Sequence, residues 1–226
     1  SKQLALITGC SGPIGRSISE TLSNLGYDLI LTDIDQTQIE KQSKQLKRRF
    51  GNKILYHSCN LNSQEQRKIF LKWVNSKSKK IDLLINNAAM TGSIKENGWN
   101  TEFKKQNISL WSKTLEVNLT SIFHIVKEVE NKLRRSKNAS IINISSIYGF
   151  LGPDWKIYDK TKLGNPAAYS VSKGGIIQLT KWLATTLGPK IRVNCISPGG
   201  IKRNQDQKFI KKYINKTPLK RMATEE

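Results

Sequence analysis

The chain has 226 residues, of which 37% are hydrophobic and 24% are charged. This supply of apolar residues is lean but sufficient for a folded core, and the length favours one domain. No apolar run approaches the roughly 20 residues that cross a bilayer, and the first residues show no signal-peptide cleavage site. We therefore expect a cytoplasmic protein. Cys10, Cys59 and Cys195 lack CxxC spacing, which predicts free thiols, and with only two histidines we predict no metal site.

The formal net charge of +21 comes from 38 Lys and Arg residues against 17 Asp and Glu residues. Such an excess is the usual first indication of nucleic-acid binding. Here the basic residues are mostly lysines spread over many segments, without the interleaved aromatic residues of a nucleic-acid platform. We therefore predict a solvated basic surface, or a field that draws an anionic small substrate, in preference to a nucleic-acid interface.

Short apolar runs alternate with longer segments of helical periodicity, as in units of strand and helix around a parallel sheet. Strands are expected at 4–8, 28–32, 53–59, 81–85, 140–145 and 190–196, and helices at 14–25, 36–50, 63–76, 112–135 and 167–187. Gly26, Gly51 and Gly188 follow three of these helices, where C-terminal caps belong. The chain at 1–226 is thus predicted to be a single α/β domain. Its fold is a Rossmann-like, doubly wound parallel sheet of at least six strands with helices on both faces.

Two long segments, 90–110 and 150–166, interrupt the regular alternation. Each follows a predicted strand, so each lies beyond the carboxyl edge of the sheet, where open α/β sheets bind ligands. Loops of this length in a compact domain are usually functional or disordered. We expect substrate specificity to reside there.

The first predicted strand runs into the segment TGCSGPIG at 8–15 and then into a helix. Glycines in this context let the backbone approach a pyrophosphate at a helix N-terminus. Asp33 ends the second strand 24 positions after Gly9, near the spacing at which a carboxylate binds the adenine-ribose hydroxyls. A carboxylate there repels the 2′-phosphate of NADP, so NAD is the favoured cofactor. The alternative is that Asp33 caps a turn or helix, with Asp35 as its competitor for the ribose.

Tyr169 and Lys173 are four residues apart on a predicted helix and therefore share one face. A cation near a phenol favours the phenolate and brings its pKa toward the range useful for proton transfer. A packed tyrosine beside a solvated lysine is the ordinary alternative for this common spacing.

Five motifs in order along the chain resemble those of the short-chain dehydrogenase/reductase family. The turn TGCSGPIG resembles TGxxxGxG, and NNAA at 86–89 resembles NNAG. Asn118 in LEVNL matches a helix-borne asparagine, Ser145-Ser146 with Gly149 resembles SSxxG, and Ser197-Pro198-Gly199 resembles a PG turn. The resemblance covers essentially the whole chain and implies a nicotinamide-dependent oxidoreductase.

The resemblance implies a role for each of four catalytic residues. Tyr169 is the general acid and base, and Lys173 lowers the pKa of Tyr169 and holds the cofactor ribose. Ser146 stabilises the substrate oxygen, and Asn118 holds a water that links Lys173 to solvent. The alternatives are a strand-end cap for Ser146, with Ser145 as the neighbour that competes for the role, and a buried structural amide for Asn118.

The resemblance also implies cofactor contacts, in addition to Tyr169 and Lys173, at Gly9, Ser11, Gly12, Ile14, Gly15, Asp33, Asn60, Leu61, Asn87, Ala88, Pro198, Gly199 and Ile201. Three residues depart from the pattern. Pro13 replaces a glycine and removes one N–H from the phosphate cradle, Asn60 replaces an acidic residue, and Arg203 stands where threonine is common. The final helix and strand of the family are not in this sequence. A homodimer or homotetramer through the helices at 112–135 and 167–187 is expected.

The second half of the chain resembles family members associated with flagellin modification and surface-glycan synthesis, which implies a sugar, sugar phosphate or nucleotide sugar as substrate. Trp155 and Tyr158 then stack on the sugar, and Lys156 and Arg203 bind a phosphate. The same residues in an ordinary solvated loop are the alternative. Two other functions remain open: a general alcohol, polyol or 3-oxoacyl reductase, and a non-catalytic dinucleotide-binding regulator or nucleic-acid binder.

Overall fold

A six-stranded parallel sheet forms the centre of the protein, whose computed structural model describes residues 2–92 and 96–225. The strand order is β3-β2-β1-β4-β5-β6, and every neighbouring pair is parallel. The strands are β1 (Leu4–Thr8), β2 (Asp28–Thr32), β3 (Ile54–Tyr56), β4 (Leu83–Asn86), β5 (Ala139–Ile144) and β6 (Ile191–Ile196). The chain winds outward in both directions from β1, so the predicted doubly wound fold is confirmed.

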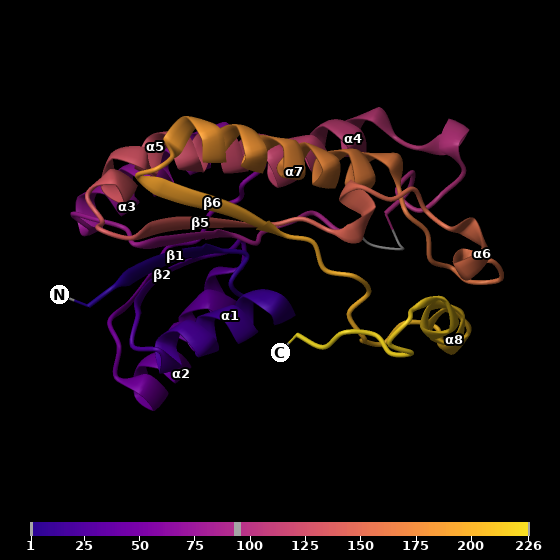
Figure 1. Cartoon of the computed structure of the whole chain (residues 1–226), viewed down its shortest axis with the longest axis horizontal. Helices are drawn as coiled ribbons and strands as arrows, with labels where there is room; N and C mark the ends of the chain where they lie inside the picture. The colour runs from indigo at the N-terminus through magenta and orange to yellow at the C-terminus, as the bar shows by residue number, and fades with distance from the viewer. Residues whose placement is uncertain (1, 93–95, 226) are drawn as a thin grey trace.

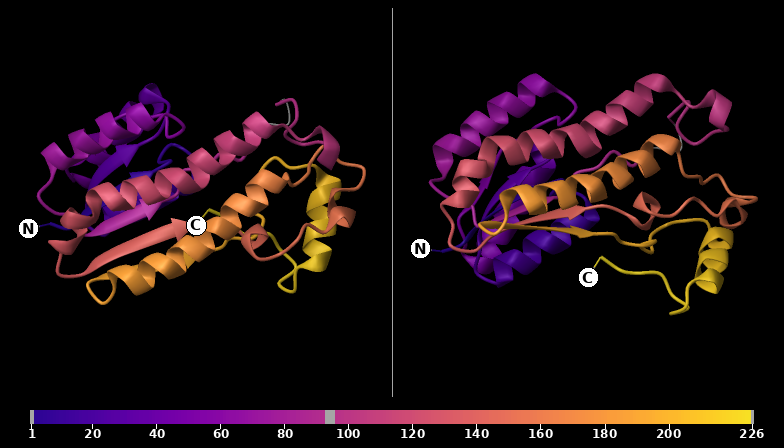
Figure 2. Two further views of the ribbon diagram at one scale, coloured as in Figure 1. Left: turned by 90° about the horizontal axis from the view of Figure 1, so that it is seen from above. Right: turned by 45° about the horizontal axis from the view of Figure 1, so that its top comes forward.

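Helices cover both faces of this sheet (Figure 1). They are α1 (Pro13–Asn24), α2 (Gln36–Phe50), α3 (Gln64–Lys77), α4 (Ile108–Leu115), α5 (Ser121–Arg134), α6 (Trp155–Tyr158), α7 (Ala167–Leu187) and α8 (Gln207–Lys216). Helices α1 and α2 lie on one face, and α3, α5 and α7 lie on the other, with α4 continuing the line of α5 (Figure 2). Within 2–92 and 96–225, none of the helices is both long and apolar enough to traverse a bilayer.

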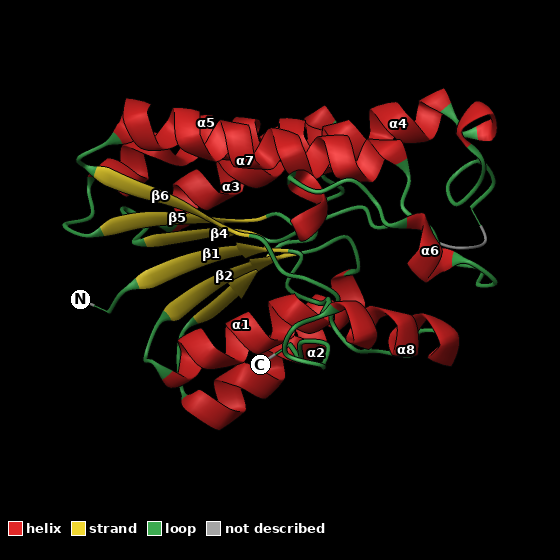
Figure 3. Cartoon of the chain, turned by 45° about the vertical axis from the view of Figure 1, so that its right-hand side comes forward, coloured by secondary structure: helices red, strands yellow, loops and turns green. Residues whose placement is uncertain are grey.

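Two apolar layers hold the sheet between its helices. One layer joins the sheet to α3, α5 and α7. The other joins strands β1, β2, β3, β4 and β5 to α1 and α2. The inner strands are buried almost throughout, as expected where helices cover both faces. Strand β6 differs because Arg192, Asn194 and Ile196 alternate outward, and Ile196 is 50% exposed. No helix of the described chain packs on that side of β6 (Figure 3).

Caps define the ends of the helices largely as the sequence predicts. Asp35 accepts a hydrogen bond from the N–H of Gln38 at 3.1 Å and begins α2. Gly51 ends the same helix with a φ of 71°, in the left-handed region that glycine adopts readily. Gly188 differs, because its φ of −67° and ψ of 157° make it extended at the end of α7.

The largest difference from the predicted elements concerns the helix expected at 112–135. The structure begins α4 earlier, where the Asn107 side chain accepts from the Ser109 N–H, and inserts a π-helical segment at Glu116–Thr120 before α5. Helix α8 was not expected, because it is short and lies after the last recognised motif. Its apolar side packs on α6 through Phe209 and Tyr158, whose ring centres are 5.5 Å apart.

Candidate functional site

A cavity of about 760 Å³ lies at the carboxyl edge of the sheet. It is lined by residues that follow each of the six strands and by the start of α7. Every residue predicted to contact the cofactor lines it, as does Ser146. Segments far apart in the sequence therefore meet at the switch point of the strand order, where such sheets bind ligands.

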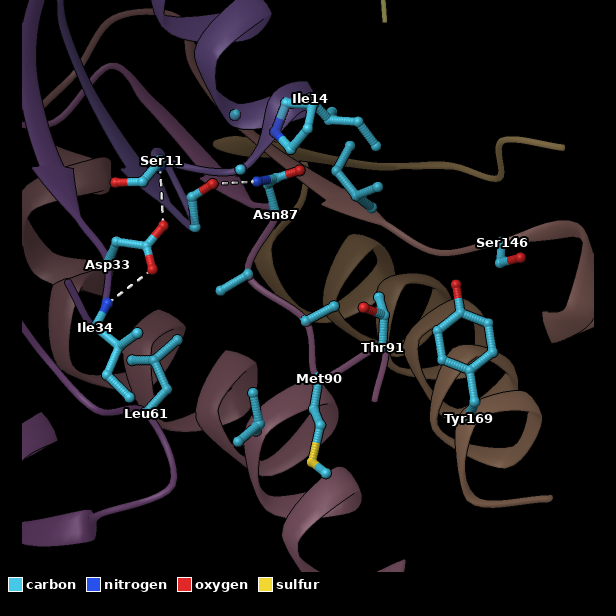
Figure 4. Close-up of a pocket in the computed structure, with 18 of the residues that line it drawn as sticks. Ser11, Ile14, Asp33, Ile34, Leu61, Asn87, Met90, Thr91, Ser146 and Tyr169 are labelled. Atoms are coloured by element: carbon cyan, nitrogen blue, oxygen red, sulfur yellow. Dashed lines mark hydrogen bonds between the residues drawn. The ribbon is translucent and has the colours of Figure 1, made fainter. Parts of the chain in front are cut away.

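The turn between β1 and α1 is held by the end of β4. The Thr8 hydroxyl accepts from the N–H groups of Asn87 and Ala88, both at 3.1 Å. The Asn87 side-chain amide donates to the carbonyls of Thr8 and Gly9 at 3.1 and 2.8 Å, as the dashed line in Figure 4 indicates. Asn87 thus fixes the shape of the turn from beside the cavity. Thr8, part of the TGCSGPIG motif, was not among the predicted contacts.

The glycines of this turn serve different purposes. A Cβ atom on Gly15 would lie 2.1 Å from the Gly9 carbonyl oxygen, and one on Gly9 would lie 2.6 Å from the Ala88 Cα, so packing requires glycine at both positions. At Gly12 the nearest atom to a Cβ is 3.6 Å away, so the fold itself tolerates a side chain there. The missing side chain leaves room on the cavity side, which fits a phosphate group brought close to the backbone.

This contrast gives a testable pair of variants. Gly12→Ala is expected to fold normally and to weaken NAD binding about tenfold, because the added methyl group occupies space beside the N-terminus of α1. Gly15→Ala is expected to lower the free energy of unfolding by more than about 2 kcal/mol, because backbone atoms must move. Denaturant titration and isothermal calorimetry with NAD measure the two effects. Equal loss of stability in both variants would contradict the assignment.

Asp33 and Asp35, the two candidates for the ribose, have separate roles in the structure. The Asp33 carboxylate accepts from the N–H groups of Ser11 at 2.9 Å and Ile34 at 2.7 Å (Figure 4). It therefore lies between the β1 and β2 turns, facing the cavity. Asp35 also borders the cavity, but one of its carboxylate oxygens caps α2. The geometry favours Asp33 as the residue that meets a ribose hydroxyl.

Asn60 and Leu61 form the wall after β3. The Asn60 side chain accepts from the Asn62 N–H at 3.0 Å, which shapes the local turn. Arg67 of α3, which is 2% exposed, donates to the Leu61 carbonyl, to His124 Nδ1 at 3.1 Å and to the Glu116 carboxylate. The buried Arg67 guanidinium therefore connects Leu61, which lines the cavity, to Glu116 of the π-helical segment. No pattern in the sequence predicts this buried arginine, since a lysine- and arginine-rich helix face is usually solvated.

Tyr169 and Ser146 face one another across the opposite end of the cavity. The Tyr169 phenol points toward the Ser146 side chain in Figure 4. Burial is the largest influence and raises the pKa of Tyr169, while the Ser146 hydroxyl lowers it. The Ser146 Oγ accepts from the Tyr148 N–H at 3.2 Å, so its own proton remains free to donate. Ser146 therefore both caps a turn and presents a donor to the cavity.

Lys173 lies behind Tyr169 and is only 2% exposed. Its Nζ donates to the Ile144 carbonyl at 2.9 Å and lies 5.7 Å from the centre of the Tyr169 ring. Burial lowers the pKa of Lys173 to about 8. The ammonium thus lies near the ring and is bonded to β5, and the lowering of the Tyr169 pKa by Lys173 stays a prediction.

The serine segment and α7 are joined closely enough to fix these three side chains relative to one another. The Ser145 hydroxyl donates to the Lys173 carbonyl at 2.7 Å. A Cβ atom on Gly149 would lie 2.8 Å from the same carbonyl oxygen, so glycine permits the approach. Ser145 is thus an anchor, and of the two adjacent serines it is Ser146 whose hydroxyl lies nearest Tyr169.

Asn118 lies in the π-helical segment and is fully buried, outside the lining of the cavity. Its Oδ1 accepts from the Met90 N–H at 2.6 Å, and its Nδ2 donates to the Met90 carbonyl at 3.2 Å and the Ser172 hydroxyl at 3.0 Å. All the hydrogens of the amide are therefore bonded to protein. These contacts identify Asn118 as a positioning residue for the strand-end segment at Met90, and its proposed water stays a prediction.

Three of the four predicted substrate residues do not line the cavity. Trp155 is 59% exposed, and Lys156 is an exposed residue at the start of α6. The Tyr158 hydroxyl is bonded to that of Tyr148, and its ring packs on Phe209 of α8. The structure does not bring these three side chains to the cavity, because α6 packs on α8. Only Arg203 lines the cavity.

Several cavity residues were missed by the sequence analysis. Met90 and Thr91 follow the NNAA motif directly, and Val117 precedes Asn118, so their positions beside recognised motifs were a usable signal. Lys113 and Gln205 also line the cavity but carry no recognisable pattern. Among the described residues, no group of three or more His, Cys, Asp and Glu side chains has the arrangement of a metal site.

A glycine-rich turn, a carboxylate at the cavity and a Ser-Tyr-Lys group in one cavity are the features of a dinucleotide-dependent oxidoreductase site. Comparison with protein families agrees, since the family described as short chain dehydrogenase matches residues 3–213. The protein belongs to the short-chain dehydrogenase/reductase family.

Known relatives cover nearly the whole chain. The 3-oxoacyl-[acyl-carrier-protein] reductase FabG of Buchnera aphidicola subsp. Schizaphis graminum is 31% identical over 100% of this chain and 86% of its own length. A short chain dehydrogenase from Leptospira borgpetersenii with bound NAD+ has a TM-score of 0.82 at 31% identity, covering 100% and 82% of the two chains. An NAD+-bound xylitol dehydrogenase has a TM-score of 0.83 at 26% identity, covering 99% and 87%. A link to flagellin modification or surface glycans does not emerge from these relatives.

Proposed function

We propose that the protein catalyses hydride transfer between NAD and a substrate with a hydroxyl or carbonyl group, most favourably a 3-oxoacyl or 3-hydroxyacyl thioester. The observation that carries the reaction type is the single cavity that joins the Gly-rich turn and Asp33 at one end to Ser146, Tyr169 and Lys173 at the other. A dinucleotide bound along it would bring its nicotinamide toward the phenol. The bound nicotinamide supplies or accepts the hydride.

The residues of the site have separate roles in proton transfer, charge stabilisation and cofactor binding. The Tyr169 phenol gives its proton to the substrate oxygen during reduction and takes it back during oxidation. The Ser146 hydroxyl donates to the same oxygen, where negative charge develops. The Lys173 ammonium has one N–H on the Ile144 carbonyl, and its other N–H groups are free to hold a ribose hydroxyl. Asn118 and Ser145 keep these groups in place.

The preference for NAD rests on the charge of Asp33. A carboxylate beside the adenine ribose opposes a 2′-phosphate by a few kcal/mol at short range. Asp33→Asn is therefore expected to lower the ratio of kcat/KM for NAD to that for NADP by at least about tenfold. Steady-state kinetics with both cofactors measure this ratio.

Asp35→Asn is the matched control for this substitution. It removes the same charge two residues away while keeping a side chain that caps helices well. The cofactor ratio of this variant is expected to stay within about twofold of the original. An equal change in both variants would mean that general charge, and not the position of Asp33, sets the preference.

The substrate class is supported by the 3-oxoacyl reductase relative and by charge. With 38 Lys and Arg residues against 17 Asp and Glu residues, the protein attracts anionic carriers of an acyl group. The polyol alternative is supported by the xylitol dehydrogenase likeness. Of the four residues predicted to bind a glycan sugar, Trp155, Lys156 and Tyr158 lie outside the cavity. The support for the glycan-sugar hypothesis is correspondingly weaker. Assembly as a dimer or tetramer stays a prediction.

The deciding experiment follows absorbance of reduced nicotinamide with acetoacetyl-CoA, xylitol and phosphorylated sugars, each with the NAD and NADP couples. We expect kcat/KM for the thioester to exceed that for any sugar by at least about 100-fold. Turnover confined to xylitol would support the polyol alternative, and turnover confined to phosphorylated sugars would restore the sugar hypothesis. Absence of binding of either dinucleotide would overturn the proposal altogether.

A further inference from the structure

Arg203 is the cavity residue whose role the proposed reaction does not explain. It lines the cavity together with Gly12 and Pro13 of the α1 turn. Within the described chain, the other cations of the lining are Lys173, bonded to Ile144, and Lys113, which lies 3.8 Å from Glu96. Arg203 is the one guanidinium among the described residues of the lining.

The α1 turn needs an additional cationic donor more than most dinucleotide turns do. Pro13 occupies the first turn of α1 and has no N–H to donate. The Gly12 cap has no side chain, and the first turn of α1 carries no acidic residue that would oppose an anion. A pyrophosphate at this helix N-terminus thus meets a favourable dipole but one donor fewer.

The guanidinium is already oriented by an ordered segment of the chain. Its Nε donates to Glu225 Oε1 at 2.9 Å, with the two side chains 45% and 27% exposed. Ala223 is paired to the loop by bonds from the Lys202 N–H to its carbonyl at 2.9 Å and from its N–H to the Gly200 carbonyl at 3.0 Å. In Figures 1 and 3 this segment runs back from α8 toward α1. Among residues 2–92 and 96–225, Glu225 bonds only Nε of Arg203, so both terminal amino groups can reach a second partner.

We propose that Arg203 binds the pyrophosphate of the dinucleotide and that Glu225 positions its guanidinium for that contact. This inference rests on the proposed dinucleotide-dependent function. Arg203 replaces part of the donor capacity that Pro13 removes from the cradle. Glu225 acts only through Arg203, by holding Nε so that the terminal amino groups face the cavity.

The test measures dissociation constants by calorimetry for NAD, ADP-ribose and adenosine. Arg203→Gln is expected to weaken NAD and ADP-ribose about tenfold, because each carries the pyrophosphate, and to leave adenosine within about twofold. Arg203→Lys keeps the charge without the planar fork and is expected to lose about threefold. Glu225→Ala is expected to weaken ADP-ribose about threefold while adenosine is unchanged.

Lys202→Gln is the matched control, since it removes one positive charge from the adjacent exposed residue, which does not line the cavity. Near-normal ADP-ribose affinity in this variant supports a local contact. Three results would overturn the assignment of Arg203. They are an equal weakening of ADP-ribose binding by Lys202→Gln, an unchanged ADP-ribose affinity in Arg203→Gln, and an equal loss of adenosine affinity in Arg203→Gln. Tighter binding in Glu225→Ala would make Glu225 a competitor and overturn its positioning role. Failure of the original protein to bind NAD would instead defeat the proposed function.

Discussion

Tyr169→Phe is expected to lower kcat by about 10³-fold while the dissociation constant for NAD changes by less than about threefold. The substitution removes only the phenolic hydroxyl, and a positioned acid or base contributes about 10² to 10⁴ in rate. The ring remains to pack beside Lys173, so the cavity keeps its shape. Turnover with the preferred substrate and calorimetry with NAD give the two quantities.

The matched control for this substitution is Tyr56→Phe, at the end of β3 and outside the cavity lining. It removes the same hydroxyl from a site without a chemical role and is expected to keep kcat within about twofold. If Tyr169→Phe retained more than a tenth of the original rate, another group would have to transfer the proton. The nearest tyrosine hydroxyls, of Tyr148 and Tyr158, are bonded to each other.

Lys173→Met is expected to reduce kcat at least about 100-fold and also to change how stability depends on pH. Burial lowers the pKa of Lys173 to about 8 in the folded protein from the ordinary value of 10.5. Between these two pH values the unfolded chain holds the proton and the folded chain does not. Raising the pH therefore favours the folded state across that window, and below pH 8 the full cost of the buried charge is present.

The size of this effect follows from the shift. Each pKa unit corresponds to 1.36 kcal/mol, so from pH 7 to pH 10.5 the original protein should gain about 3 kcal/mol relative to Lys173→Met. Denaturant unfolding at a series of pH values measures this difference. Lys181→Met, an exposed lysine on the same helix, is the control and should leave activity and the pH profile unchanged. A flat difference between the original protein and Lys173→Met would show that Lys173 is not a buried cation.

The elements predicted best are those whose own residues determine their conformation. Strands β1 and β2 begin and end where the apolar runs LALIT and DLILT do. Helix α2 has its own cap at Asp35 and its own glycine at Gly51. Local signals of this kind are complete in the sequence, because a cap or an apolar run acts on neighbouring residues.

The elements missed are those that depend on distant partners. Helix α8 packs on α6 through Phe209 and Tyr158, so its stability comes from a segment about 50 positions away. The π-helical segment places Asn118 against Met90 and Ser172, and π-helical segments are frequent at functional sites. No local sequence pattern predicts such long-range contacts.

The sequence by itself determined the parallel α/β fold, the glycine-rich turn after the first strand and the placement of Tyr169 and Lys173 on one helix, because these depend on the periodicity and spacing of nearby residues. Only the tertiary structure decided which polar side chains face the cavity. It bonded Asp33 to the Ser11 N–H while Asp35 caps a helix, packed Tyr158 into a small apolar cluster, and brought Arg203 to the cavity. The physical reason is that direction at a loop is set by what the loop packs against, and those partners lie elsewhere in the chain.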